Sequence, residues 1–596
     1  MPKTSDETDQ LDKGLIELVD DALERSSWLL KENSNTRISP SLIDLYVTSQ
    51  VKKTYALNRL YSKQVSQSHK DGYIHIHDLH NPFVPYCAGH DARIFLLDGL
   101  RFPDARSHPA KKFDTAVYHT MAYLFHSQQF FAGAQAIDVF NWLLAPHLYR
   151  DRLDYKQVKQ ILQGFIFQMN QSNRIGSQSA FTNLGLRVRC PPYLECEKAI
   201  WAGHRLKYTY ADFENEARMI YQAIMEVLSE GDADGAPFTF PLVTTAITSD
   251  LDKNDPLWIA TMKATSSKGA PYFLNLTTDY LKENFVQAMC CRLLVTHSGG
   301  VWSAGGMGTG SNKVITVNLP RIALESKDEP SFFELLEAKM EIARVGLIQS
   351  NKIIKRSLDE WQILPWLKMK TKDGQPYYDF EQRRLTFGIV GLNECLLNLI
   401  HEPITSDEGY KFGLMVIKYM HEQIKNYSEK DGVTYTFEQT PAESAAHRLA
   451  MIDRSKFPTA NVQGTSDGAY YTNSTHVPYA LDISLIDKVS IESEFHPYFT
   501  GGTMCHIWMG ESHPDPTGLN EIVKKLSETK LAYFCFSPDF SVCENNHVSR
   551  GKKERCQTCG GIILTHISRV TGYFGRTTQW NPGKQEEYKS RHRYSL

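Results

Sequence analysis

The sequence predicts an α/β fold, and two patterns support this prediction. Short runs of β-branched and aromatic residues, Tyr73–His77 and Lys313–Val317, have the composition of strands. Longer stretches, Phe113–Phe131 and Phe332–Ile353, have the apolar spacing of helices. Alternation of the two kinds of segment is typical of strands joined by crossover helices. Because neither an internal repeat nor a low-complexity linker interrupts the middle of the chain, we expect one continuous domain there.

Length and charge limit the classes of protein to which the chain can belong. With 596 residues it is too long for one ordinary core, unless that core is a large α/β barrel with insertions. A formal net charge of −3 gives no overall attraction to nucleic acid or to an acidic membrane surface, so any phosphate ligand must be held locally. The N-terminus lacks a signal pattern and no run of about 18 apolar residues occurs, so we expect a soluble protein.

Cysteine usage indicates a reducing compartment. The chain contains 11 cysteines, an odd number, and they are scattered apart from one dense cluster near the C-terminus. Secreted disulfide frameworks instead place an even number of cysteines in a short chain. We therefore expect a cytoplasmic protein.

Three regions differ in composition. Residues 1–70 have a helical pattern, with a helix start at Ser39-Pro40, where Ser can cap the helix and Pro can occupy its first turn. Residues 71–535 carry the alternating pattern and are predicted to form the α/β domain. Residues 536–596 contain cysteines, basic residues and few helical periods, so we expect a separate C-terminal module.

The segment Arg569–Gly575 resembles the one on which glycyl radical enzymes store an unpaired electron, with Gly572 at the radical position. A glycine α-carbon radical can be planar and delocalised between its two amides, because no side chain crowds either face. The simpler interpretation of an isolated motif of this kind is a turn glycine with positive φ. Other parts of the chain must therefore agree before the radical role is accepted.

The paired cysteines Cys290 and Cys291, within Met289–Leu293, are the first such agreement. A radical held on the backbone needs a mobile delivery atom. A thiol suits this task because its S–H bond is similar in strength to an activated C–H bond. The alternative is that both cysteines are buried apolar residues.

Further segments match one family in a fixed order. They are Arg174–Asn183, Pro237–Pro241, Pro271–Phe273, Thr316–Arg321, Thr440–Glu443 and Tyr498–Thr503. From about His75 to the C-terminus the chain resembles the anaerobic, class III ribonucleotide reductases. The resemblance implies a ten-stranded α/β barrel of two five-stranded halves around a central finger loop. It also implies an oxidoreductase that makes deoxyribonucleotides for DNA synthesis.

The resemblance assigns the two radical positions and a second thiol. Cys291 is the thiyl residue and Cys290 its alternative; Gly572 passes the radical to the Cys291 sulfur, which abstracts the ribose 3′-hydrogen. The 2′-hydroxyl then leaves as water, and the hydrogen returns to C3′. Cys87 matches the first-strand cysteine that supplies hydrogen from the opposite face, although a buried structural cysteine is a fair competitor.

Histidines and aspartates near Cys87 invite a metal interpretation, because His-x-His can bind one ion. They are His75, His77, Asp78, His80, His90 and Asp91. Since the segment is similar to the family's I-H-D motif, we expect hydrogen-bonded supports instead of metal ligands.

The electron donor depends on one position. Members of the family that use formate carry an asparagine seven residues before the Asn of the T-x-N-L-P segment, and counting back from Asn318 gives Ser311. A register slip of one residue would place Asn312 there. With Ser311 in that position, a redoxin-type dithiol is the expected reductant and formate the alternative. Glu438 is then the candidate carboxylate for acid/base work on the ribose hydroxyls.

Thr440, Pro441, Ala442 and Glu443 are the predicted substrate segment. Thr at the N-cap, Pro at the first helical position and Glu at the third predict a capping box and a helix start. The free amide groups at such a helix start suit phosphate oxygens, as the resemblance also implies. The alternative is a plain helix start without a ligand.

The C-terminal cysteines predict structural zinc. Cys556 and Cys559 form a C-x-x-C pair about a dozen residues after Cys543, and His547 is the proposed fourth ligand because position 546 is Asn. Cys535 is the spare candidate. Basic residues nearby also fit a nucleic-acid-binding zinc ribbon, but a charge run is more often a solvated face.

The resemblance implies further partners: a ribonucleoside triphosphate substrate, a nucleotide effector at a homodimer interface, and a radical S-adenosylmethionine activase that installs the glycyl radical. The runner-up function is another glycyl radical enzyme, an acyltransferase or a dehydratase. A zinc-ribbon nucleic-acid-binding protein is the remaining alternative, and it leaves the long α/β region unexplained. Base preference and effector-site residues are not encoded in any recognisable pattern.

Overall fold

The described residues of this computed structural model form a barrel from ten strands in one hydrogen-bonded path. The structure describes residues 5–25, 27–282, 285–289, 292–297, 310–372, 374, 376–510 and 513–596. In order, the path runs β15 (Tyr435–Glu438), β14 (Arg384–Val390), β13 (Gly310–Asn318), β2 (Cys87–His90), β3 (Gln135–Ile137), β6 (Thr182–Leu186), β9 (Leu242–Ile247), β10 (Tyr272–Asn275), β17 (Tyr533–Ser537) and β16 (Cys505–Trp508).

The path divides into two halves of five strands. The first half contains β2, β3, β6, β9 and β10, which are all parallel to one another. In the second half, β13, β14 and β15 are parallel to their neighbours, and β16 is parallel to β17. The halves meet antiparallel where β2 pairs with β13 and where β10 pairs with β17. The ends of the path are joined by a bridge between Glu438 and Gly502. The ten-stranded barrel in two halves, which the family resemblance implied, is therefore confirmed.

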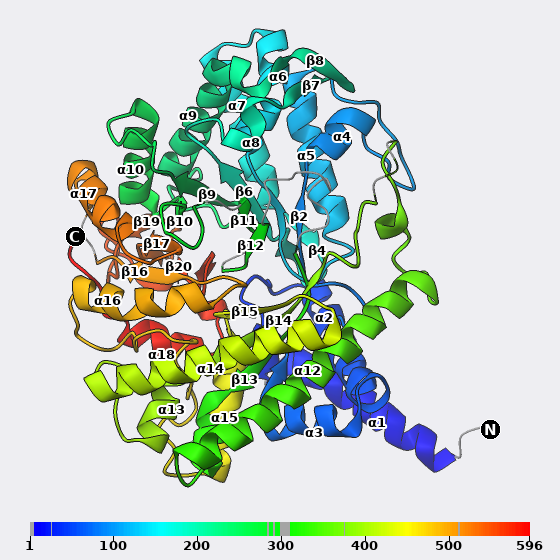
Figure 1. Cartoon of the computed structure of the whole chain (residues 1–596), viewed down its shortest axis with the longest axis vertical. Helices are drawn as coiled ribbons and strands as arrows, with labels where there is room; N and C mark the ends of the chain where they lie inside the picture. Colours follow the sequence, from blue (N-terminus) through cyan, green and yellow to red (C-terminus); the bar gives the residue numbers. More distant parts are fainter. Residues whose placement is uncertain are drawn as a thin grey trace.

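Helices cover the outer face of both halves (Figure 1). They include α5 (Phe113–Ser127), α6 (Phe140–Asp151), α7 (Tyr155–Met169), α9 (Glu214–Glu230) and α10 (Pro256–Lys268) on the first half, and α12 (Glu329–Asp359) and α14 (Asp407–Asp431) on the second. Outward residues of β13 and β14, such as Ile315 and Phe387, pack in one apolar cluster with Leu347 of α12 and Val416 of α14. The alternation of strands and helices predicted from the sequence is confirmed.

The two predicted strand runs pair with each other. β1 (Ile74–Ile76) lies antiparallel to β13, with Ile74 opposite Val317. The N-terminal helices are α1 (Ser5–Glu24), α2 (Pro40–Tyr55) and α3 (Lys63–Asp71). The predicted start of α2 is confirmed, because the Ser39 side chain accepts a hydrogen bond from the Leu42 amide. Within the part of the chain that the structure describes, none of the helices combines the length and apolar character needed to cross a bilayer.

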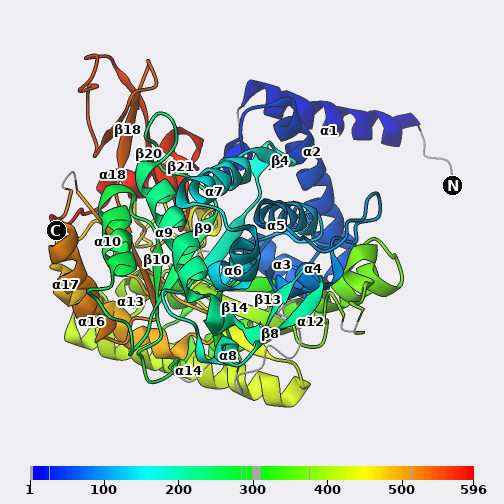
Figure 2. The same cartoon turned by 90° about the horizontal axis from the view of Figure 1, so that it is seen from above.

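A four-stranded sheet near the C-terminus projects from the barrel at one end (Figure 2). Its strands are β18 (Phe540–Cys543), β19 (Val548–Arg550), β20 (Ile563–Arg569) and β21 (Phe574–Arg576), in the order β19-β18-β20-β21, and α18 (Pro582–Ser590) follows. The β20–β21 hairpin carries Gly572 in its loop.

Candidate active site

Gly572 lies in a tight, buried loop. Arg569 pairs with Phe574 across the hairpin, and the Val570 amide donates to the Tyr573 carbonyl at 3.1 Å. Val570 and Tyr573 pack in one apolar cluster with residues on the inner faces of β9, β10 and β17, among them Leu274 and Tyr533. The loop is therefore inserted into the barrel and shielded from solvent.

A finger hairpin approaches this loop. It consists of β11 (Phe285–Ala288) and β12 (Leu294–His297), and Ala288 and Leu294 belong to the same apolar cluster as the glycine loop. The two predicted thiyl candidates, Cys290 and Cys291, lie outside the described residues. Met289 and Leu293, which flank them in sequence, pack with Cys87.

Cys87 is the first residue of β2 and is fully buried. Its Sγ accepts a hydrogen bond from the Ala134 amide at 3.2 Å, and its carbonyl accepts one from the Arg383 guanidinium. A Cβ added to Gly133 would lie 2.5 Å from this sulfur, so only glycine leaves room for the thiol. These contacts hold the Cys87 thiol beside the residues that flank positions 290 and 291.

Ser311 and Asn312 point to opposite faces of β13. Ser311 is opposite Cys87, and its Oγ lies 2.8 Å from the Thr386 hydroxyl. The Asn312 side chain instead contacts Asn351 of α12 at 2.7 Å and accepts a hydrogen bond from Tyr378. Asn312 is therefore fixed on the helix-covered outer face.

Glu438 ends β15 on the inner face of the barrel. It is buried, lies opposite Gly388 of β14, and forms the bridge to Gly502 that closes the barrel. Thr436, two residues earlier, lies on the same face, and its hydroxyl is 3.0 Å from that of Thr386. A row of hydroxyls from Ser311 through Thr386 to Thr436 therefore leads toward the carboxyl group.

The predicted capping box at Thr440–Glu443 is wrong. Helix α15 (Ala445–Lys456) begins at Ala445, its N-cap is Ser444, and Ala442 has a φ of 47° that interrupts the helical path. The Thr440 hydroxyl bonds the Thr316 hydroxyl at 2.9 Å instead of a helical amide. The side chains of Thr440 and Glu443, the predicted capping residues, instead form hydrogen bonds with residues distant in sequence. A local sequence pattern could not indicate these partners.

Glu443 connects three regions of the chain. Its carboxyl accepts hydrogen bonds from the Ser34 amide at 2.8 Å, from the Ser34 hydroxyl, and from the Tyr573 hydroxyl at 3.1 Å. Burial raises the pKa of Glu443, although these donors act against that shift. The N-terminal region, for which the sequence predicted only a helical pattern, therefore contributes Ser34 to the site.

One cavity of about 180 Å³ lies between the segment before α15 and the glycine loop. It is lined by residues 441–444 at the start of α15, by Thr571 and Tyr573 of the glycine loop, and by Gly133 next to Cys87. Arg174 also lines the cavity. It belongs to the segment Arg174–Asn183, which resembles the family but for which the sequence predicted no function. The helix start still faces a cavity where a phosphate could lie, despite the altered cap.

Two of the histidines near Cys87 make the hydrogen bonds expected of supports. His77 Nε2 lies 2.7 Å from the Thr316 hydroxyl, and His90 Nε2 lies 2.7 Å from the Gln135 side-chain oxygen. Burial lowers the pKa of each histidine to about 4, so both are neutral near pH 7. Among the described residues, the one group with metal-ligand geometry lies elsewhere, at Cys543, His547, Cys556 and Cys559.

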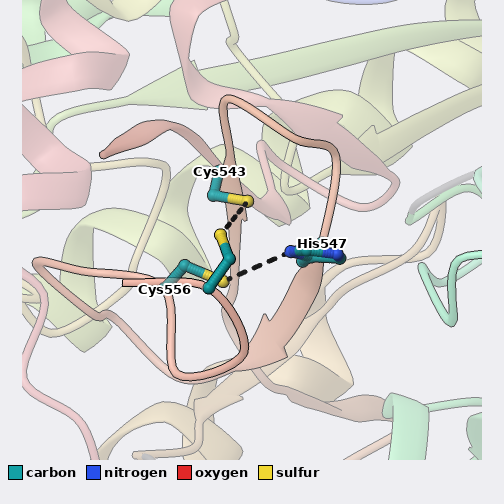
Figure 3. A group of neighbouring side chains, drawn as sticks. Cys543, His547 and Cys556 are labelled. Carbon is teal, nitrogen blue, oxygen red and sulfur yellow. Dashed lines mark hydrogen bonds between the residues drawn. The ribbon is translucent and has the colours of Figure 1, made fainter. Parts of the chain in front are cut away.

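That group gathers at the outer end of the C-terminal sheet (Figure 3). Its ligand atoms lie within 4.8 Å of one another; the sulfurs of Cys543 and Cys559 are 3.9 Å apart, and Cys556 Sγ is 3.7 Å from His547 Nδ1. Tetrahedral zinc with bonds of about 2.3 Å would place two sulfurs about 3.8 Å apart. The donors and their spacing therefore fit a zinc ion. Cys535 is not in this group, because its sulfur faces His506 at 3.3 Å.

The fold and the site define a class of protein. A ten-stranded α/β barrel that holds a finger hairpin and a buried glycine loop is the architecture of ribonucleotide reductases and glycyl radical enzymes.

Comparisons with known proteins narrow the class. The family model of the anaerobic ribonucleoside-triphosphate reductases matches residues 32–594. The reductase of this name from Haemophilus influenzae is 25% identical and is aligned over 97% of the chain and 85% of its own length. The one from enterobacteria phage T4 is also 25% identical, over 94% of the chain and 96% of its own. The chain belongs to the anaerobic ribonucleoside-triphosphate reductase family, a family of oxidoreductases.

Solved structures agree with the fold. An anaerobic ribonucleotide reductase superposes with a TM-score of 0.78 at 24% identity, covering 99% of the chain and 94% of that structure. The Thermotoga maritima enzyme in complex with dATP and CTP gives 0.75 at 22% identity, covering 96% and 98%. A hydroxyproline dehydratase from Clostridioides difficile shares the barrel more distantly, with 0.52 at 10% identity over 96% and 88%.

Proposed function

We propose that the chain reduces ribonucleoside triphosphates to 2′-deoxyribonucleoside triphosphates without oxygen, by a radical stored on Gly572. The observation that supports this most is the convergence of three segments inside one barrel. The glycine loop and the finger hairpin share an apolar cluster, and the residues that flank positions 290 and 291 pack with Cys87. Relatives that are aligned over 85% and 96% of their own length carry the name of this activity.

The proposed reaction follows from the residue types. The Gly572 radical takes a hydrogen atom from Cys291, with Cys290 as the alternative, and the thiyl radical takes the ribose 3′-hydrogen. Glu438 transfers the proton that the 2′-hydroxyl needs to leave as water. Cys87 then supplies hydrogen from the opposite face, and C3′ regains its hydrogen atom from the thiol. A radical SAM activase installs the glycyl radical at the start.

The two electrons come from a redoxin-type dithiol in this proposal. Cys87 and a second thiol, such as Cys290, become a disulfide, which exchange with the external dithiol reduces again. The inward Ser311 and the outward Asn312 support this choice over formate. Serine is too short to reproduce the two-sided hydrogen bonding of an asparagine amide.

Substrate and effector sites complete the proposal. Pro441, Ala442 and Glu443 line the cavity just before α15, and Thr440 precedes them in the chain. In this proposal the four residues form the substrate segment, where backbone amides suit the triphosphate. The Thermotoga maritima relative has been solved with dATP in its specificity site. We infer that this chain also responds to a nucleotide effector and acts as a homodimer in the cytoplasm.

Zinc at Cys543, His547, Cys556 and Cys559 is proposed to be structural. The site lies about 20 Å from the glycine loop, because the seven residues of β20 separate them. The ion would link the loops at the outer end of the sheet without touching substrate.

An anaerobic assay tests the activity and the reductant together. Activated protein receives a ribonucleoside triphosphate and effector, with either formate or a thioredoxin system, and deoxyribonucleotide formation is measured. We expect turnover with the thioredoxin system alone. Carbon dioxide release from formate in step with the product would contradict the choice of reductant. Lack of product from protein with a verified glycyl radical, under every nucleotide and reductant combination, would contradict the activity.

A further inference from the structure

Buried side chains hold three successive backbone carbonyls just before Gly572. Arg591 donates from Nη1 to the Arg569 carbonyl at 2.9 Å and from Nη2 to the Val570 carbonyl at 3.2 Å. The third carbonyl, that of Thr571, lies 2.7 Å from His506 Nε2. This last oxygen belongs to the amide whose nitrogen is that of Gly572.

The Thr571 carbonyl determines the tautomer of His506. A carbonyl oxygen only accepts hydrogen bonds, so Nε2 must carry the proton. Burial and the positive charges of nearby arginines lower the pKa of His506 far below its usual value, so the ring is neutral. A neutral ring with a proton on Nε2 has a lone pair on Nδ1.

Cys535 supplies the donor for that lone pair. Its Sγ lies 3.3 Å from His506 Nδ1, and the two residues are opposite each other on the parallel strands β17 and β16. Burial raises the pKa of the Cys535 thiol, which keeps its hydrogen available for donation. On its other side Cys535 Sγ lies 3.4 Å from the Ser537 hydroxyl, which itself accepts a hydrogen bond from Arg569. The donors therefore run in one direction, from Ser537 through Cys535 and His506 to the Thr571 carbonyl.

Packing leaves the His506 ring little freedom to turn. The ring stacks on Trp508 with a centroid distance of 5.0 Å and an interplanar angle of 9°. The Arg591 guanidinium lies 3.7 Å from the Trp508 centroid. The side chains that hold the three carbonyls are therefore packed against one indole ring.

We propose that His506 is a positioning residue for Gly572, oriented by Cys535, and that it fixes the plane of the Thr571–Gly572 peptide in the radical-bearing loop. This role rests on the proposed function, in which Gly572 carries the radical. A glycyl radical is most stable when both flanking amides are coplanar with the radical carbon. Between paired Arg569 and Phe574, one backbone bond, from Val570 to Tyr573, spans the loop, so side-chain contacts must orient its other peptides.

Four substitutions separate positioning from packing: His506→Leu, His506→Gln, Cys535→Ala and Cys535→Ser. Leu fills the space without a donor, whereas the Gln side chain can bring an N–H to the place of Nε2. Ala removes the donor to Nδ1, and Ser keeps it. Cys505→Ala is the matched control, because Cys505 is a buried thiol on β16 that packs on the outer face of the barrel.

The measurement is the electron paramagnetic resonance spectrum of each activated variant, recorded anaerobically with the radical yield per chain. In His506→Leu we expect about tenfold less radical than in the wild type, because a buried carbonyl loses its donor. The remaining signal should show an altered splitting from the single α-hydrogen. His506→Gln should recover most of the yield, Cys535→Ala should shift the same splitting, and Cys535→Ser and Cys505→Ala should match the wild type.

Two kinds of contrary result can be told apart. If wild-type protein gives a glycyl radical and His506→Leu gives the same yield and splitting, the positioning role is wrong. The positioning role is also wrong if His506→Gln gives no higher radical yield than His506→Leu while both variants keep the wild-type unfolding temperature. If activated wild-type protein gives no glycyl signal at all, the proposed function itself fails.

Discussion

The two ends of strand β20 are held in different ways. At the outer end the chain is exposed: Ile562 and Leu564 are 57% and 62% exposed, and four metal-type ligands connect the loops. At the inner end Thr571 and Tyr573 are 3% and 4% exposed, and the backbone is held by His506 and Arg591.

In our proposal this difference separates a supporting end of the module from the end that carries the radical. A metal ion bound by the four ligands would add order at this exposed outer end. The inner end is ordered by the barrel that encloses it and faces the cavity with Thr571 and Tyr573. Damage at the outer end should act on the radical through the fold, whereas damage at the inner end should act on it directly.

The largest effect is expected from breaking the outer end. Cys556→Ser together with Cys559→Ser should abolish zinc binding and reduce both radical yield and turnover at least about 100-fold, because the support of the glycine loop is lost. Metal content per chain, radical yield and turnover are measured together. Cys196→Ser is the control, since Cys196 is an exposed cysteine outside the site. A zinc-free variant with normal radical yield would show that the outer end is dispensable.

The second largest effect is expected from Glu438→Gln, which should stop nucleotide reduction without disturbing the glycine loop. Glu438→Gln removes the carboxyl group that we assign to proton transfer, so turnover should fall about 1,000-fold. The Gly572 radical should form in normal amount, because Glu438 lies on β15 and not in the loop. Turnover within a few-fold of the wild type would remove Glu438 from the mechanism.

A smaller effect is expected from substitutions of Ser311 and Asn312 on β13, which should differ in whether they change turnover or stability. Asn312→Ala should lower the free energy of unfolding by about 2 kcal/mol, because buried hydrogen bonds to Asn351 and Tyr378 are lost. Ser311→Ala should leave stability closer to the wild type and reduce turnover several-fold by breaking the row of hydroxyls. Denaturant unfolding and turnover are measured for both. The reverse pattern would place Asn312, and not Ser311, on the substrate side.

The smallest effect is expected for Tyr573→Phe. It removes the hydroxyl that donates to Glu443 while keeping the ring against Phe240, so about 1 kcal/mol of stability should be lost. Radical yield should change less than about threefold, in contrast to His506→Leu. A loss as large as that of His506→Leu would mean that the cavity side also positions the glycine.

The fold was largely predictable because its signals are local or periodic. The strand run at residues 313–317 and the helical run at 332–353 appear in β13 and α12, and Ser39 caps α2 as predicted. The spacing of the C-terminal cysteines and His547 likewise indicated which side chains gather there.

What the sequence could not provide are contacts between distant segments. Glu443 was predicted to cap its own helix, yet its partner Ser34 lies 409 positions away. The contact between His506 and Cys535 could not be predicted from the sequence, because only the pairing of β16 with β17 brings the two residues together near the Thr571 carbonyl. A local motif predicts local bonds, and tertiary partners can replace them.

Every other proposal for this chain depends on storage of the radical on Gly572 in the buried loop. The direct test is electron paramagnetic resonance of anaerobically activated protein, made with ordinary or α-deuterated glycine, beside Gly572→Ala. We predict a doublet from the one remaining α-hydrogen, its collapse on deuteration, and no signal in Gly572→Ala. A signal that is insensitive to deuteration, or that persists in Gly572→Ala, would contradict the account.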